Sequence, residues 1–198
     1  MRSLLVVYNE KSKKSYIIKP LKLNKQSNVY INMSQQIPVK IRTAMISDLP
    51  DILYIINHSI TTSSSDYRYD TINTEELEQW YNQNPVFVAA TNNIVVGYAT
   101  YGQFRERIGF QYSVEHSIYC HHDYQGKGIG RLLMNELIAY AKEQKIHTMV
   151  ACIDSDNTNS IAFHKKLGFQ QAGQMKEIGY KFGRYLDMTF MQLMLNNN

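Results

Sequence analysis

The sequence lacks any long apolar run. None of its 198 residues belongs to an apolar segment close to the ~20 residues that a membrane-spanning helix needs. The apolar run at residues 4–7 is also too short for a signal-peptide core, which needs roughly 7 to 15 apolar residues, and no small-residue cleavage site follows it. We therefore expect a cytoplasmic protein without a membrane partner.

Cysteine is scarce, since the chain contains only Cys120 and Cys152. Both lie inside apolar runs typical of strands, which favours buried free thiols over a disulfide or a redox pair. A metal site built from His116, His121 and His122 is not expected either. Neighbouring histidines on a strand face opposite ways, and no carboxylate spacing completes a ligand shell. We expect no metal.

A uniform excess of positive charge is also missing. The net charge is +4. Residues 1–40 contain eight basic residues and one acidic residue, whereas residues 41–198 contain thirteen basic and sixteen acidic residues. The body of the chain is thus mildly acidic. The basic N-terminal piece carries no motif of a nucleic-acid reader, so no nucleic-acid partner is expected.

Residues 1–37 have few apolar residues among many Lys, Ser and Asn, which predicts a poorly ordered basic extension. An alternative is that Met33 is the true start and that the preceding residues are not translated. Residues 38–198 then form one domain, which is long enough to bury a sizeable core.

The apolar spacing in this domain predicts alternating strands and helices. Helix caps are expected at Ser47 and Thr74, and Asn92-Asn93 is expected to form a tight hairpin turn. The predicted strands lie near residues 39–42, 86–90, 94–100, 112–120, 148–153, 169 onward and 185–195; the predicted helices follow Ser47 and Thr74 and cover about 129–144 and 157–167. This order predicts an α/β (α+β) domain, a mixed sheet flanked by helices.

The segment Gln125-Gly126-Lys127-Gly128-Ile129-Gly130 stands between a predicted strand and a predicted helix. Its glycines let the backbone adopt positive φ, and the first helical turn has N–H groups without intrahelical partners. Such a turn suits a phosphate or pyrophosphate. It matches neither the Walker loop nor the GxGxxG fingerprint. The alternative is a turn whose glycines only relieve crowding.

This turn resembles the Gln/Arg-x-x-Gly-x-Gly/Ala turn of the GNAT superfamily of N-acetyltransferases, with Gln125, Gly128 and Gly130 at the matching positions. In that superfamily the turn holds the pyrophosphate of acetyl-coenzyme A (acetyl-CoA). The resemblance implies the GNAT fold, whose central sheet is mixed and mostly antiparallel, and acetyl-CoA as cosubstrate.

Acyl transfer to an amine needs a base for the ammonium group, and Glu115 is the first candidate. In an alternating strand Glu115, Ser117 and Tyr119 share one face while His116 and Ile118 share the other, so either Glu115 or His116 points inward. Glu115 could accept the proton directly or through water. The alternative is a structural glutamate paired with a neighbouring arginine.

A second segment runs from Asn157 to Phe169 and resembles the superfamily pattern Asn-x-x-Ala-x-x-x-Tyr-x-x-x-Gly-Phe. Asn157 is placed to cap a helix or to bond an amide of a ligand. Ser160 replaces the alanine, and His164 replaces the tyrosine that protonates the departing thiolate in many members. Imidazole can do the same. The alternative for His164 is a packed or surface histidine.

Together with residues 113–119, 159–169 and 179–187, the turn resembles the phosphinothricin acetyltransferase branch over residues 38–195. Members of that branch acetylate small amino acids such as methionine sulfone, methionine sulfoximine and phosphinothricin, and often form dimers. The resemblance implies that the cofactor is held by Ile118, Tyr119, Cys120, Gln125, Gly126, Lys127, Gly128, Ile129, Gly130, Asn157 and Ser160.

The same branch binds its amine substrate with a loop that Phe104, Arg105 and Glu106 resemble, together with Val114 and His116. Arg105 could hold an amino-acid carboxylate bidentately, or it could belong to a solvated charge run. Residues 106–109 depart from the branch, as does His122 at a position where proline is common, so the identity of the amine stays open.

We therefore expect a homodimeric N-acetyltransferase that moves an acetyl group from acetyl-CoA to the α-amine of a small amino acid or analogue. Direct attack without an acyl-enzyme is expected because no Cys/His nucleophile is evident. Two alternatives stay open: an acetyltransferase for a protein N-terminus or a polyamine, and a sensor that binds acyl-CoA without turnover.

Overall fold

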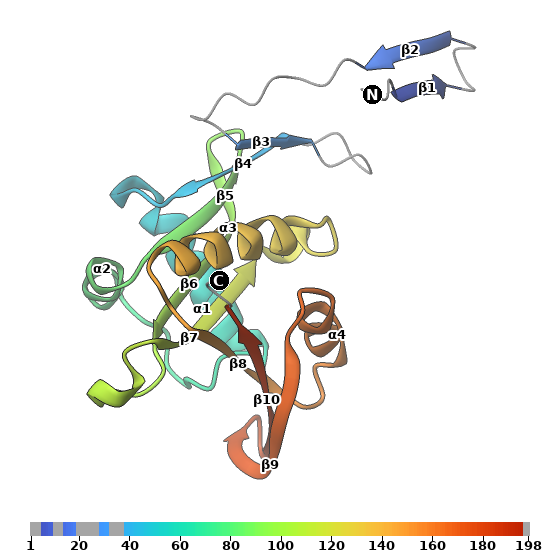
Figure 1. Cartoon of the computed structure of the whole chain (residues 1–198). Helices are drawn as coiled ribbons and strands as arrows, with labels where there is room; N and C mark the ends of the chain where they lie inside the picture. The colour runs from blue at the N-terminus through green and yellow to red at the C-terminus, as the bar shows by residue number, and fades with distance from the viewer. Residues whose placement is uncertain (1–4, 10–13, 19–27, 32–37, 196–198) are drawn as a thin grey trace.

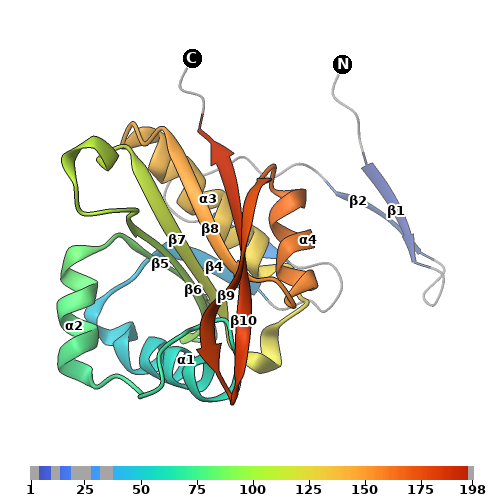
Figure 2. The same cartoon turned by 90° about the horizontal axis from the view of Figure 1, so that it is seen from below.

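The fold is built on one eight-stranded sheet (Figures 1 and 2). The computed structural model describes residues 5–9, 14–18, 28–31 and 38–195. Strands β1 (Leu5–Asn9) and β2 (Lys14–Ile18) pair with each other as a separate two-stranded sheet. The expected disorder of residues 1–37 falls largely on residues outside the described ranges and stays a prediction.

The large sheet has the strand order β3-β4-β5-β6-β7-β8-β10-β9. All neighbours are antiparallel except β7 and β8, which are parallel, so the predicted mixed and mostly antiparallel sheet is confirmed. Its strands are β3 (Asn28–Ile31), β4 (Pro38–Thr43), β5 (Val86–Thr91), β6 (Ile94–Gln103), β7 (Ser113–Cys120), β8 (Thr148–Asp154), β9 (Gln170–Lys181) and β10 (Arg184–Met194).

Within residues 38–195, four α-helices flank the sheet: α1 (Leu49–Thr62), α2 (Thr74–Gln83), α3 (Ile129–Glu143) and α4 (Thr158–Lys166). Short 3-10 turns occupy η1 (Ile46–Asp48), η2 (Ile108–Phe110) and η3 (His122–Tyr124). One buried cluster packs α3 against the sheet and the other packs α1 and α2 against the opposite face, which Figure 2 shows from below.

Two helix starts differ from the prediction. Ser47 lies inside η1, and the carboxylate of Asp48 instead accepts hydrogen bonds from Arg42 and from the amide of Met45, which moves the start of α1 to Leu49. Asn73, one residue before Thr74, caps α2 in a capping box with Glu76. Because Asn and Thr both cap well, local sequence did not distinguish them.

The hairpin turn at Asn92 and Asn93 is confirmed, since both residues adopt positive φ, 49° and 64°. Among the described residues, no helix is long and apolar enough to cross a membrane.

The feature that creates the site is the separation of β7 from β8. Their pairing covers only Ser113–Glu115 against Thr148–Val150. Both strands continue past this register, β7 to Cys120 and β8 to Asp154. Beyond Glu115, the edge of β7 that faces β8 therefore has main-chain N–H and C=O groups that β8 does not pair. The opposite edge of β7 pairs with β6 along its length.

Candidate active site

A cavity of about 590 Å³ lies where β7 and β8 part, and we call it the central cavity. Side chains from residues 115–120 of β7 and residues 151–154 of β8 line it, and helix α1, the loop at residues 63–68 and helix α4 complete its wall. An unpaired strand edge beside a cavity can bind an extended ligand as if the ligand were another strand.

A second cavity of about 690 Å³, the phosphate-side cavity, surrounds the Gly-rich turn and the start of α3. It shares Ile118, Cys120, Gln125 and Ser160 with the central cavity, so the two are continuous. Arg131 and Lys166 also line it and supply positive charge. The pair of cavities therefore suits a long ligand with phosphates at one end.

The Gly-rich turn has the geometry that its sequence predicts. Gly126 and Gly128 adopt φ of 71° and 78°, in the left-handed region, and Gly128 is the N-cap of α3. The amides of Arg131 and Leu132 bond back to the carbonyl of Gly128. The amides that precede them open α3 without intrahelical partners, as is general at helix starts, and they can donate to an anion.

Asn157 and Ser160 hold the start of α4 against the central cavity. The side chain of Asn157 caps the helix by accepting from the amide of Ser160 at 3.0 Å, which confirms its capping role. The carbonyl of Ser160 in turn accepts from Nδ1 of His164 at 2.7 Å. Because a carbonyl only accepts, Nδ1 carries the proton in this arrangement and Nε2 of His164 is the acceptor.

His116 is the buried member of the Glu115/His116 pair, and its ring stacks on His164 with 5.0 Å between centroids. Burial, and to a smaller extent His164, lowers the pKa of His116 to about 3. Burial also lowers the pKa of His164. Both rings are neutral near pH 7, and the nitrogens of His116 and Nε2 of His164 have no hydrogen-bond partner among the described residues.

Glu115 faces the side of the sheet that α1 and α2 cover, together with Ser117 and Tyr119 as the alternation predicts, and it lines the central cavity half-buried. It lies beside the thiol of Cys152. Burial raises the pKa of Cys152 to about 12, and the Glu115 carboxylate adds to this through its negative charge and by accepting a hydrogen bond from the thiol. Burial raises the pKa of Cys120 to about 12 as well.

Both cysteines are free and half-buried, and both line the central cavity. The prediction of free thiols is confirmed. Because their pKa values are far above neutrality, neither is an activated nucleophile.

A third cavity of about 320 Å³, the acceptor-side cavity, lies between the sheet and the helices α1 and α2. Trp80, Tyr98 and Ile72 give it aromatic and apolar walls, while Asp66, Arg68, Ser117 and Tyr119 belong to it and to the central cavity. The two cavities therefore meet at Ser117 and Tyr119, on the face of β7 that Glu115 shares.

The sequence does not predict this part of the site, because residues 61–70 read only as a polar loop between two predicted helices. Arg68 donates to both carboxylate oxygens of buried Asp66, at 3.0 Å and 2.5 Å. Buried Lys181 donates to the carbonyls of Ser63 and Asp66, which fixes the loop against β9. No local motif marks these residues, because Lys181 is 115 positions from Asp66.

The structure brings most predicted residues together. Both catalytic candidates, Glu115 and His164, line the central cavity, as does His116. Of the predicted cofactor residues, all except Lys127 line one of the first two cavities: Ile118, Tyr119, Cys120, Gln125, Gly126, Gly128, Ile129, Gly130, Asn157 and Ser160.

Apart from His116, the predicted substrate residues do not line these cavities. Val114 is buried in the core, and Phe104, Arg105 and Glu106 follow β6 at the surface without lining these three cavities. Arg105 is nevertheless close enough to lower the pKa of Cys152 slightly by its charge, against the larger effect of burial. Its clamp on a carboxylate stays a prediction.

The family model for the acetyltransferase (GNAT) domain matches residues 41–190. The chain is 42% identical to an L-methionine sulfoximine/L-methionine sulfone acetyltransferase of Salmonella typhimurium, over 80% of this chain and 95% of that protein. It is 31% identical to a phosphinothricin N-acetyltransferase of Streptomyces viridochromogenes, over 78% of this chain and 87% of that protein.

Among solved structures, the fold is similar to a putative acetyltransferase from Salmonella typhimurium with its cofactor acetyl-CoA. The TM-score is 0.78 at 42% identity, and the match covers 81% of this chain and 95% of that one. The sequence match, the parted strands and the Gly-rich turn agree, and the chain belongs to the GNAT family of acetyltransferases.

Proposed function

We propose that this protein transfers the acetyl group of acetyl-CoA to the α-amine of a small amino acid or analogue of the methionine sulfone, methionine sulfoximine or phosphinothricin type. The observation that carries the proposal is that three cavities meet along residues 117–120 of β7, and that Glu115 lines the central one. The names of the amino-acid acetyltransferases that this chain resembles support the substrate class.

Acetyl-CoA is the acyl donor. Its pyrophosphate is held by the amides of the turn at residues 125–130, with Arg131 and Lys166 as cationic neighbours. Its pantetheine arm lies along the open edge of β7, where the main chain of residues 118–120 bonds it, and Asn157 borders it from α4. This places the thioester near Glu115 and His164.

The amine attacks directly. Glu115 accepts the ammonium proton, the amine nitrogen forms a bond to the thioester carbonyl carbon, and the carbon–sulfur bond then breaks to release the thiolate. Main-chain N–H groups of β7 stabilise the developing oxyanion. The high pKa values of Cys120 and Cys152 argue against an acyl-enzyme, because a neutral thiol is a poor nucleophile.

His164 returns the proton to the thiolate. Since its Nδ1–H is committed to the carbonyl of Ser160, the proton must pass through Nε2, which is buried and has no partner among the described residues. Nε2 is unprotonated at rest, so it first takes up the second proton that the amine nitrogen loses as the amide forms, and then donates this proton to the thiolate.

The acceptor amino acid has its side chain in the acceptor-side cavity beside Trp80. Arg105, with Phe104 and Glu106 in the same loop, holds its carboxylate; this part of the proposal rests on the resemblance of the loop, since these residues do not line the cavity. Trp80 is the single tryptophan of the chain, so its fluorescence reports binding at this cavity. His116 of β7 borders the site on the face of the sheet that carries α4, where it stacks on His164. Val114 of the same strand is buried in the core and helps to hold the strand in place.

A homodimer in the cytoplasm, with no nucleic-acid or membrane partner, completes the proposal. The hairpin β9–β10 supports a dimer because it exposes large apolar side chains: Met175, Ile178, Tyr180, Phe182 and Tyr185. Light scattering of the purified protein tests this, since a monomer mass would refute the dimer.

The direct test of the function is thiol release from acetyl-CoA by the purified chain, with a panel of acceptors. The panel contains L-amino acids, methionine sulfone, methionine sulfoximine, phosphinothricin, polyamines and N-terminal peptides. Release with the amino-acid analogues supports the proposal. Release only with polyamines or peptides overturns the substrate class, and acetyl-CoA binding without release anywhere overturns the enzyme in favour of a sensor.

A further inference from the structure

Three of the six histidines, His58, His121 and His122, gather at the end of β7, and the proposed acetyl transfer uses none of them. The chain leaves the strand at Cys120 and enters η3, so His121 and His122 do not alternate as neighbours on a strand would. Their rings stack with 4.3 Å between centroids, and His58 from α1 stacks on His122 at 4.6 Å. The expectation that these neighbours face apart is wrong.

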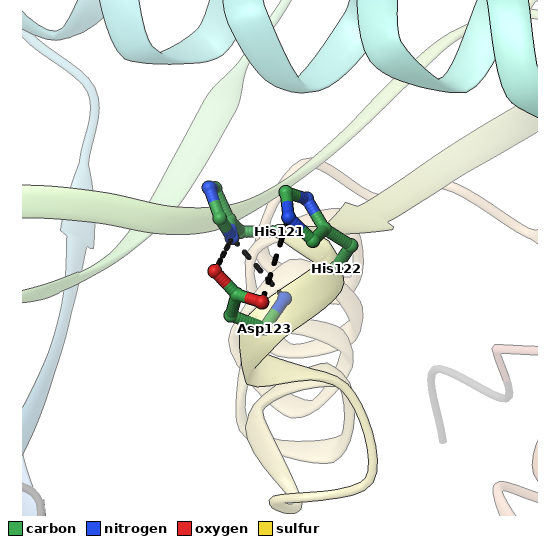
Figure 3. A group of neighbouring side chains, drawn as sticks. All are labelled: His121, His122 and Asp123. Carbon is green, nitrogen blue, oxygen red and sulfur yellow. Dashed lines mark hydrogen bonds and ion pairs between the residues drawn. The ribbon is translucent and has the colours of Figure 1, made fainter.

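The ligand atoms of His121, His122 and Asp123 converge (Figure 3). All lie within 4.8 Å of one another. Nε2 of His122 is 3.5 Å from Oδ1 of Asp123, and Nδ1 of His121 is 3.9 Å from Oδ2. Donor atoms around a tetrahedral metal with bonds of about 2.1 Å are about 3.4 Å apart, which is close to these two distances. Because the two rings are stacked, they must turn for both lone pairs to face one ion.

The charge around the cluster favours a cation. Nδ1 of His121 carries a lone pair in this arrangement, because it accepts a hydrogen bond from a main-chain amide. That lone pair on Nδ1 accepts a long hydrogen bond, 3.3 Å, from the amide of Asp123, which a metal would replace. The carboxylates of Asp123 and Asp51 are the nearby negative charges.

We propose that His121, His122 and Asp123 bind a divalent transition metal ion of the zinc class. Imidazole and carboxylate donors suit Zn²⁺, Ni²⁺ and Co²⁺, and three protein ligands leave the fourth position of such an ion to water. The site lies directly before the Gly-rich turn, and His58 also lines the central cavity. The metal has no part in the proposed acetyl transfer.

Cobalt provides the test, because Co²⁺ bound by imidazole absorbs visible light. The untagged full-length protein is stripped with a chelator, dialysed and titrated with Co²⁺, then with Zn²⁺ as competitor. We expect one equivalent of Co²⁺ to bind and Zn²⁺ to displace it. His122→Ala and Asp123→Asn are each expected to weaken binding at least about tenfold, because each removes a ligand.

The matched control is His147→Ala. His147 directly precedes β8, is exposed, and belongs to no such cluster among the described residues. This variant should bind Co²⁺ as the parent does. Absence of binding in the parent, or binding that survives both His122→Ala and Asp123→Asn, overturns the proposal. Acetyl-CoA binding by every variant verifies folding, and Asp123→Asn changes an exposed side chain without removing volume.

Discussion

His116 on β7 and His164 on α4 stack across the wall of the central cavity, with 5.0 Å between their ring centroids and 29° between their planes. Phe169 packs edge-on against both. Two buried imidazoles in contact can stay uncharged more easily than either can gain a proton. The pair therefore links the stability of the fold to pH.

The first prediction concerns that link. The pKa of His116 is about 3 in the folded protein, below the ordinary value of 6.5, so only the unfolded chain gains this proton as the pH falls between these values. The free energy of unfolding should decrease by about 1.4 kcal/mol per pH unit in this window, and His164 adds to the decrease. Urea unfolding from pH 6.5 to 4.5 measures it.

His116→Phe should flatten this slope, because phenylalanine has no proton to gain. His147→Gln is the matched control and should keep the parent slope, since His147 is exposed. An unchanged slope in His116→Phe would show that other groups, such as His164, cause the acid sensitivity in this window.

The second prediction concerns the proposed base. Glu115→Gln should reduce kcat by roughly 10²-fold or more, the usual contribution of a positioned base, while the affinity for acetyl-CoA stays within about twofold. The rate should recover partly at high pH, where the amine is already deprotonated. Glu143→Gln, an exposed residue on α3, serves as control. Unchanged turnover by Glu115→Gln would refute the role of Glu115.

The third prediction concerns the Gly-rich turn. Gly128→Ala places a side chain at φ of 78°, which should cost about 1–2 kcal/mol and weaken acetyl-CoA binding, although no atom lies within 4 Å of the new Cβ. Gly109→Ala also meets nothing within 4 Å and lacks the positive φ, so it should leave stability and binding unchanged. Calorimetric titration with acetyl-CoA distinguishes the two variants; equal affinities would contradict the conformational argument.

The fourth prediction concerns the cavity wall behind Tyr67. A Cβ at Gly179 would lie 2.8 Å from Cδ1 of Tyr67 and closer still to Cε1, so Gly179→Ala should destabilise the fold by about 1–3 kcal/mol. Gly173→Ala on the same strand meets nothing within 4 Å and should be nearly neutral. The double variant with Tyr67→Ala should be less destabilised than the sum of the single variants; simple additivity would mean that the overlap is relieved elsewhere.

The sequence predicts the parts of the site whose residues are neighbours along the chain. Glycines at alternate positions before an apolar helix pattern locate the turn, and strand alternation places Glu115 with Ser117 and Tyr119. Asn157 is recognisable as a cap because its partner, Ser160, is three residues away. In each case local backbone geometry determines the outcome.

The remaining features depend on distant contacts. Lys181 fixes the loop that presents Asp66 and Arg68, and the start of α1 depends on an ion pair between Arg42 and Asp48. The sequence predicts the strand end at Cys120 correctly, but not the η3 turn after it or the approach of His58 from α1, which together create the histidine cluster. Apolar spacing predicts neither a short 3-10 turn nor a contact between distant segments, so these juxtapositions need the structure.

The central claim is that an α-amino group receives the acetyl group directly. The most direct test incubates the purified chain with acetyl-CoA and L-methionine sulfone, identifies the product by mass spectrometry and NMR, and records the intact mass of the protein. We predict one N-acetyl group on the α-nitrogen per thiol released, and no acetylated protein when the acceptor is absent. Acetyl-enzyme without acceptor, or acetylation of polyamines or peptides but of no amino acid, would contradict the account.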